Sequence, residues 1–503
     1  MVILDNPTLD DCLNWETEIA RLQQRILSCD TPHVLGIHGD WGAGKTSFMR
    51  QLQAALGGEA AQGDALEGRQ PAQDSPENQD AQKLAKEMRQ KVCTIWFDAW
   101  RYQNESTPIL ALLQEMRAQF NWRIELAQKL KKGGKLALDI AVRSVLDNFL
   151  KGITLGNISL ESVEKRAEKQ EAQGISSALT TNAIRKHLQE SIDFLLQVLS
   201  GKGDARVVVF IDDLDRCNPK AAMRLLEGLK IYLSLKNCVF VLGMNEGVLT
   251  EAISEEFASM KSASAQECSL KAAHYLEKIG TDLFRLPLPA SNLQLFCDML
   301  RKLEKLQSTA GTPPSQAAED DQVMARLAPW LAALDSANQN QPHEVSGCLD
   351  RALPPNPRRL KALANQWHRF AACEHFPQQD AEGMAEEKRR LWAVRLLIAA
   401  YVHQFNRDIW ERWRFDPDFW TDLHNFCLGN GPTLSSDEKK QHWSGVLQLP
   451  YTPSNASTDS TARPNPGDQT VFWIAHLIQT YGANLRANEF QFLLQGRKNP
   501  GVL

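Results

Sequence analysis

The 503-residue chain has no long apolar run, no cysteine pair of metal-binding spacing and no strong excess of either charge. A helix that spans a bilayer needs about 20 consecutive apolar residues, and no segment reaches that length. The ten cysteines form neither a C-x-x-C pair nor a Cys/His pattern typical of zinc, and no charged and apolar leader opens the sequence. The formal net charge of −5 disfavours a globally basic nucleic-acid binder. We therefore expect a cytoplasmic protein with reduced thiols and no transmembrane span.

One motif near the start of the chain predicts a phosphate-binding loop. Residues 39–46 fit the pattern G-x-x-x-x-G-K-[ST], between an apolar run at 34–38 that predicts a strand and a segment at 47–52 that predicts a helix. In such a loop the backbone N–H groups surround phosphate, the lysine reaches the β- and γ-phosphates and the threonine ligates Mg²⁺. The predicted nucleotide-binding residues are Gly39, Asp40, Trp41, Gly42, Ala43, Gly44, Lys45, Thr46 and Ser47.

A second motif is an apolar run, Val207–Ile211, followed directly by acidic residues. The run predicts a buried strand of a parallel sheet. Asp212 at its end is the expected Mg²⁺ ligand together with Thr46, and Asp213 is expected to orient or deprotonate the attacking water. Asp215 and Arg216 fit a functional role at this site and a solvated loop with a surface ion pair about equally well.

A third apolar run, from Cys238 to Met244, predicts another strand that ends at Asn245. An amide at this position could hydrogen-bond the γ-phosphate and the attacking water as a sensor. Asn245 would equally well cap the helix that begins at Glu246, a role that asparagine fills often. One side chain could serve both roles.

Together with further segments, these motifs resemble the KAP family of P-loop NTPases, in its bacterial form without transmembrane helices. The segments are 95–102, 212–216, 275–279 with 284–287, and 356–361, and the resemblance covers about residues 1–370. It implies an α/β fold with a P-loop NTPase core, whose parallel sheet of the additional-strand type is sandwiched by helices. A helical lid and an α-helical C-terminal region would follow. The strand inserted between the Walker A and Walker B strands would be 92–97.

The resemblance also implies arginines that act on the nucleotide. Arg358 or Arg359 resembles an arginine that reaches the γ-phosphate from the lid, and Arg285 is a weaker candidate for contacting the nucleotide of a neighbouring subunit. A guanidinium group suits this task because it stays protonated and neutralises phosphate charge. The alternative for Asn356 and Pro357 is an ordinary helix start, with asparagine as the cap and proline in the first turn.

The expected domains follow from the motifs and from polar stretches between them. They are a P-loop core at 1–290, with a mobile insert at about 57–82 and a helical insert at about 105–200, a lid at 291–375 and an α-helical region at 385–503. Within the helical insert, 129–155 has lysines and apolar residues at helical spacing. This basic amphipathic helix could contact a membrane or a partner, but packing on the core is the favoured interpretation.

The C-terminal region is dense in aromatic residues. Such rings could stack on bases or bind a partner, and nearby arginines are compatible with nucleic-acid binding. Their spacing among leucines and isoleucines favours the core of a helical bundle. The rings are Trp392, Phe405, Trp410, Trp413, Phe415, Phe419, Trp420, Phe426, Trp443, Phe472 and Trp473.

The sequence thus predicts a hydrolase of nucleoside triphosphates with ATP and Mg²⁺ as cofactors, coupled to conformational change or assembly. Its predicted catalytic residues are Lys45, Asp213, Asn245, Arg358 and Arg359. The resemblance implies bacterial defence against phages or plasmids, with a second copy of the chain or proteins of the same operon as partners. Two alternatives are a nucleotide-gated scaffold that recruits an effector with little turnover, and a motor stimulated by nucleic acid.

Overall fold

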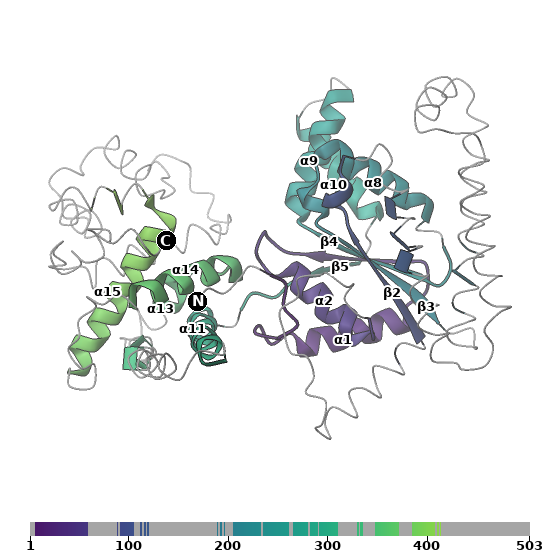
Figure 1. The fold of residues 1–503 in the computed structure, drawn as a ribbon. Helices are drawn as coiled ribbons and strands as arrows, with labels where there is room; N and C mark the ends of the chain where they lie inside the picture. Colours follow the sequence, from purple (N-terminus) through teal and green to yellow (C-terminus); the bar gives the residue numbers. More distant parts are fainter. Residues whose placement is uncertain are drawn as a thin grey trace. The chain divides into compact units, whose positions relative to one another are not determined.

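The chain forms two compact units, an N-terminal unit at 6–287 and a C-terminal unit from residue 288 onward (Figure 1). The computed structural model describes 6–58, 91–104, 205–232, 235–260, 265–279, 282–289, 291–309, 348–371 and 385–407, with further residues at 88, 111–119, 189–196, 329–334 and 410–413 in part. The basic helix expected at 129–155 lies outside the described residues, as do nearly all of the insert at 57–82 and most of the one at 105–200. The three-part domain division stays a prediction.

The N-terminal unit is built on a five-stranded sheet with the order β2-β3-β4-β1-β5. All neighbouring strands are parallel. Strands β3 and β4 are buried at nearly every position, because helices cover both faces of the sheet. The predicted α/β core is therefore confirmed. The strands are β1 (His33–His38), β2 (Val92–Asp98), β3 (Arg206–Asp212), β4 (Cys238–Met244) and β5 (Asp282–Arg285).

The segment 92–97 forms a strand as predicted, but not in the predicted place in the sheet. Strand β2 lies at the outer edge beside β3, whereas β4 separates the Walker A strand β1 from the Walker B strand β3. The order of strands along a chain does not specify their order in a parallel sheet, because each crossover can return on either side of the strand it left. The prediction that 92–97 lies between β1 and β3 is therefore wrong.

Helices cover the two faces of the sheet (Figure 1). Val208 and Phe210 of β3 pack with α1 and α2, whereas Val207 and Val209 belong to the core shared with α8, α9 and α10. This division follows from the alternation of side chains along a strand. The helices are α1 (Glu16–Ser28), α2 (Lys45–Ala55), α8 (Pro219–Tyr232), α9 (Glu246–Met260) and α10 (Ala265–Ile279).

The C-terminal unit is helical in its described parts, with α11 (Asn292–Thr309), α13 (Cys348–Ala352), α14 (Pro357–Ala371) and α15 (Glu386–Phe405). Helix α14 contacts both α11 and α15. Trp410 and Trp413 are buried, and Trp410 stacks on Phe370 with ring centroids 5.8 Å apart. These two rings belong to a helical core, as predicted. The aromatic residues after 413 lie outside the described residues.

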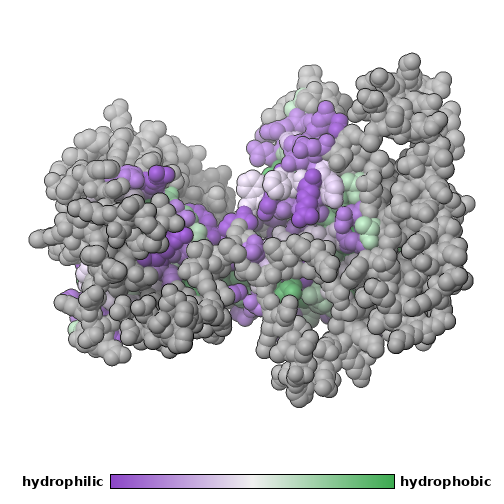
Figure 2. All heavy atoms as spheres, viewed as in Figure 1, coloured by the Kyte–Doolittle hydropathy of each residue, from purple (hydrophilic) through white to green (hydrophobic). Residues whose placement is uncertain are grey.

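The described surface is largely hydrophilic on the face drawn in Figure 2. Large apolar side chains that are exposed include Trp41, Trp100 and Leu288. Within the described ranges, no helix combines the length and the apolar character needed to cross a bilayer.

Candidate active site

The loop between β1 and α2 has the shape that the glycine pattern predicts. Gly42 and Gly44 have φ angles of 82° and 95°, which residues with a Cβ rarely adopt. A Cβ on Gly44 would also come within 2.8 Å of the Trp15 ring. The Ala43 N–H donates to the Asp40 carbonyl at 3.0 Å and closes a turn inside the loop. The backbone conformation therefore depends on glycine at both positions.

The ammonium group of Lys45 lies inside this loop and has three oxygen acceptors. Its Nζ donates to the Gly39 carbonyl at 2.8 Å, to the Asp40 carbonyl at 3.4 Å and to Asp215 Oδ2 at 3.2 Å. Asp215 Oδ2 also accepts the indole N–H of Trp41 at 3.0 Å. Asp215 is buried, so the solvated-loop alternative is wrong for this residue. Burial is tolerated because the carboxylate faces a cation and a second donor.

Two further contacts tie the loop to its surroundings. The Gly39 N–H donates to the Met244 carbonyl of β4 at 3.3 Å. The backbone N–H of Thr8 donates to Ser47 Oγ at 3.1 Å, so the segment before α1 holds the first turn of α2. The predicted binding residues 39–47 thus form one continuous loop and helix start.

Asp212 ends β3 next to the start of α2. The residue is 3% exposed, and its Oδ1 has no hydrogen-bond partner among the described residues. The Thr46 hydroxyl hydrogen-bonds the same carboxyl group. Burial raises the pKa of Asp212 and Asp98 raises it further, whereas Thr46 and Lys45 oppose the rise. A Cβ on Gly243 would lie 2.8 Å from Oδ1, so this glycine leaves the space that the carboxyl group occupies.

Asp213 follows in a left-handed backbone conformation, with φ of 56°, and precedes the short helix η2 (Leu214–Arg216). Its Oδ1 forms an ion pair with Arg216 Nε at 3.0 Å. Burial raises the pKa of Asp213 to about 7, with a further rise from Asp212 and an opposing effect of Arg216. Arg216 itself is exposed, as the surface ion-pair alternative predicts.

Asp98 is a site residue that reasoning from the sequence did not single out. It ends β2 and pairs in register with Asp212. Its Oδ1 accepts the backbone N–H of Trp100 at 3.1 Å, and its Oδ2 pairs with Arg101 Nε at 3.1 Å. The available signal was an acidic residue directly after an apolar run, the same signal that identified Asp212.

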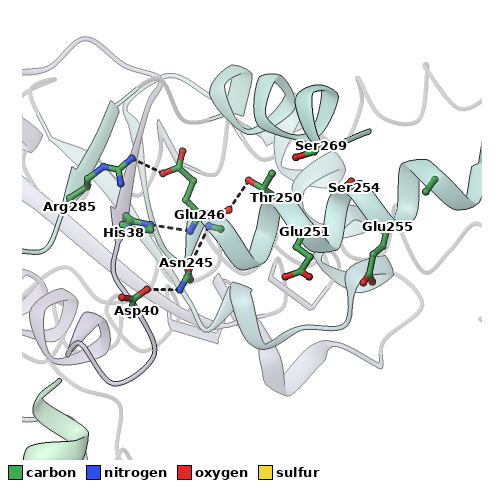
Figure 3. A pocket seen from close by; sticks show the side chains of 12 residues that line it. His38, Asp40, Asn245, Glu246, Thr250, Glu251, Ser254, Glu255, Ser269 and Arg285 are labelled. Carbon is green, nitrogen blue, oxygen red and sulfur yellow. Dashed lines mark hydrogen bonds and ion pairs between the residues drawn. The ribbon is translucent and has the colours of Figure 1, made fainter. Parts of the chain in front are cut away.

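Asn245 links the phosphate loop to α9 (Figure 3). Its Oδ1 accepts the backbone N–H groups of Gly247 at 3.0 Å and Val248 at 3.3 Å, so the predicted helix cap is confirmed. Its Nδ2 donates to Asp40 Oδ1 at 3.1 Å. One amide therefore caps a helix and contacts the loop, while its role as a sensor of phosphate stays a prediction.

A pocket of about 810 Å³ opens beside this contact and is lined by residues of β1, β5, α9 and α10 (Figure 3). At its wall, Arg285 Nη2 pairs with Glu246 Oε2 at 2.9 Å, and the Glu246 N–H donates to His38 Nδ1 at 3.0 Å. Burial lowers the pKa of His38, and Arg285 lowers it further. Arg285, the weaker candidate for a neighbour's nucleotide, is thus engaged by a carboxylate of its own chain.

Arg358 and Arg359, which were predicted to act from a lid, lie in the C-terminal unit, in the first turn of α14. Asn356 Oδ1 accepts the backbone N–H groups of Arg358 at 3.1 Å and Arg359 at 3.2 Å. The alternative of an ordinary helix start, with asparagine as cap and Pro357 in the first turn, is therefore confirmed. The Arg359 guanidinium lies 4.4 Å from the centre of the Phe405 ring. A role of either arginine at the phosphates stays a prediction.

Comparison with known families agrees with this site. A family model described as the KAP family P-loop domain matches residues 16–373. A search of curated proteins finds no match to the chain. The matched segment begins at α1, includes the phosphate loop and the acidic end of β3, and extends through α14. Because it covers well over half of the 503 residues, the chain belongs to the KAP family of P-loop NTPases.

Proposed function

We propose that the protein is a Mg²⁺-dependent nucleoside triphosphatase that uses ATP. Membership of a P-loop NTPase family supports nucleotide hydrolysis as the general activity. The observation that carries the proposal is the environment of Asp212. Oδ1 of its buried carboxyl group has no hydrogen-bond partner in the part of the chain that the structure describes, and the side chain of Thr46 lies beside it.

These two residues fit Mg²⁺. The ion prefers oxygen ligands and is held in P-loop proteins by the hydroxyl after the lysine and by the acid of the Walker B strand. Thr46 and Asp212 supply those two oxygens, already hydrogen-bonded to one another. The bound ion would neutralise negative charge on the phosphate groups. A cation would also favour the ionised carboxylate, whose pKa burial raises.

The remaining roles belong to the chain itself. The loop that contains Gly42 and Gly44 would surround phosphate oxygens with backbone N–H groups. Lys45 would hold the β- and γ-phosphates, and Asp213 would accept a proton from the attacking water. Asn245 lies against the loop through Asp40 and would orient the same water.

The direct test is phosphate release from ATP in the presence and absence of Mg²⁺. We expect Lys45→Ala to lose turnover, and Asp213→Asn to bind ATP but turn over at least about 100-fold more slowly. Asp30→Asn removes an exposed carboxylate and is the matched control, with the rate of the wild type expected. Wild-type turnover by Lys45→Ala would refute the site. GTP in the same assay tests the choice of ATP.

The same assay tests the expected partners. An arginine supplied by a second copy of the chain would make the rate per chain rise with protein concentration. A constant rate per chain would support a self-sufficient site and would direct attention to Arg358 and Arg359. A protein of the same operon that raises the rate would support a hetero-complex.

A further inference from the structure

The hydrogen-bond donors of the Lys45 ammonium group are all engaged by this chain. A lysine has three N–H donors, and the three acceptors here are the carbonyl groups of Gly39 and Asp40 and the carboxylate of Asp215. A phosphate oxygen can therefore reach this ammonium group only by replacing one of them. The affinity of the site for phosphate then depends on which acceptor is displaced and on the hydrogen bonds that remain to the displaced acceptor.

Asp215 is the acceptor that a phosphate group would replace. The Gly39 carbonyl makes the shortest of the three contacts, and the backbone N–H of Gly39 is tied to β4. Asp215 reaches Lys45 by a rotatable side chain and is the only charged acceptor of the three. A phosphate brought against Lys45 would repel this carboxylate, because like charges at close range are unfavourable.

Trp41 determines whether Asp215 keeps a hydrogen-bond donor when Lys45 binds another anion. The indole N–H donates at 3.0 Å to the same oxygen, Oδ2, that accepts from Lys45. The Asp215 side chain is 1% exposed, so it has almost no contact with water to replace a lost partner. A buried carboxylate without a donor is strongly disfavoured. The contact with Trp41 therefore keeps Asp215 partnered after it releases Lys45.

We propose that Asp215 sets the affinity of this site for the phosphate groups of a nucleotide, by competing with them for Lys45, and that Trp41 holds Asp215 when it is displaced. The proposal rests on the proposed function and specifies how the same site is regulated. Asp215 is a positioning residue in this scheme. It lowers phosphate affinity, so a nucleotide is released more readily than from a site with a free lysine.

Two substitutions should change phosphate affinity in opposite directions. Asp215→Asn removes the competing charge and keeps an oxygen acceptor for Trp41, so we expect Mg²⁺·ADP and pyrophosphate to bind about tenfold more tightly. Trp41→Phe leaves the displaced Asp215 without its second donor, so we expect both ligands to bind at least about threefold more weakly. Isothermal titration calorimetry measures both changes, with circular dichroism to verify folding.

A matched pair of controls separates competition from direct contact with the ligand. Adenosine carries no phosphate, so its affinity should be the same in the wild type and in both variants. In the Asp215→Asn background, Trp41→Phe should no longer weaken binding, because the displaced group carries no charge. If Asp215→Asn does not fold, Trp41→Phe alone decides the question, since Trp41 is 57% exposed and its loss should leave the core intact.

The proposed competition between Asp215 and phosphate for Lys45 is refuted if Asp215→Asn leaves pyrophosphate affinity unchanged or weakens it. It is also overturned if Trp41→Phe leaves pyrophosphate affinity unchanged, or weakens adenosine binding as much as pyrophosphate binding. A wild-type protein that binds neither nucleotide nor pyrophosphate would instead refute the proposed function. The two failures are therefore distinguishable in one set of titrations.

Discussion

Asn245 makes two contacts that two substitutions can separate. Its Oδ1 caps α9 by accepting the N–H groups of Gly247 and Val248, and its Nδ2 donates to Asp40 in the phosphate loop. Asn245→Ala removes both contacts. Asn245→Asp keeps the capping oxygens but places a second carboxylate against Asp40. Comparison of the two variants measures how much the link between loop and helix contributes.

The magnitudes follow from the geometry. Loss of an asparagine cap costs about 1 kcal/mol, and loss of the hydrogen bond to Asp40 adds about 0.5–1 kcal/mol in Asn245→Ala. In Asn245→Asp the cap remains, but two like charges meet where the amide and the carboxylate are now 3.1 Å apart. At the dielectric constant of water this repulsion is about 1 kcal/mol, and it is larger where water is partly excluded. Salt reduces the repulsion but has little effect on the cap.

Urea unfolding followed by circular dichroism, at 20 mM and 500 mM NaCl, measures these differences. We expect Asn245→Ala to lose about 1.5–2 kcal/mol at both salt concentrations, as summed above. Asn245→Asp should lose about 1.5–2 kcal/mol at low salt, from the lost hydrogen bond to Asp40 and the repulsion, and regain about 1 kcal/mol of this at high salt, where the repulsion is screened. Asn218 is the matched control, because its Oδ1 caps α8 by accepting the Ala221 N–H at 2.8 Å.

The result that would refute this reasoning is an Asn245→Asp variant as stable as the wild type at low salt. Equal losses in Asn245→Ala and Asn218→Ala would show that the contact with Asp40 contributes nothing beyond the cap. In either case the amide would be a helix cap alone. A sensor role would then need evidence from turnover rather than from stability.

Two further predictions concern buried positions. Burial lowers the pKa of His368 to about 4. As the pH falls below 6.5, this histidine is therefore protonated in the unfolded chain while it stays neutral in the folded chain. His368 should therefore contribute a drop of about 2 kcal/mol in the free energy of unfolding from pH 8 to pH 5, measured by urea unfolding as the difference between the wild type and His368→Leu at the two pH values. Gly243→Ala would place a Cβ 2.6 Å from Met49 Sδ and 2.8 Å from Asp212 Oδ1. We expect a loss of about 1–3 kcal/mol in urea unfolding and a higher Mg²⁺ requirement for phosphate release; unchanged values would show that both neighbours yield easily.

The features that the sequence predicted correctly depend on residues close together along the chain. The phosphate loop, its strand and its helix occupy one short segment, and the glycine spacing specifies the turn. Helix caps are equally local, since Asn245 and Asn356 bond to N–H groups two and three residues ahead. Apolar runs predicted β3 and β4 because a strand covered on both faces has almost no polar position.

The features that it missed depend on contacts between distant segments. Lys45 and Asp215 are 170 positions apart, and no local pattern shows that the loop after β3 turns its third acid toward the lysine. The place of β2 in the sheet is likewise decided by crossovers rather than by the pattern of 92–97. The position of Asp98 beside Asp212 also follows from the register of β2 with β3 and not from any local pattern.

The spacing of acids after β3 also explains the electrostatics of the site. Asp98 and Asp212 end neighbouring strands, and Asp213 and Asp215 follow within three residues, so four carboxyl groups gather at one edge of the sheet. Their mutual repulsion adds to burial in raising the pKa of Asp212 and of Asp213. Lys45 and Arg216 compensate part of this charge, at Asp215 and Asp213 respectively. Asp212 has no cationic partner at hydrogen-bond distance among the described residues, and its unpaired oxygen is where a divalent cation would relieve the repulsion most directly.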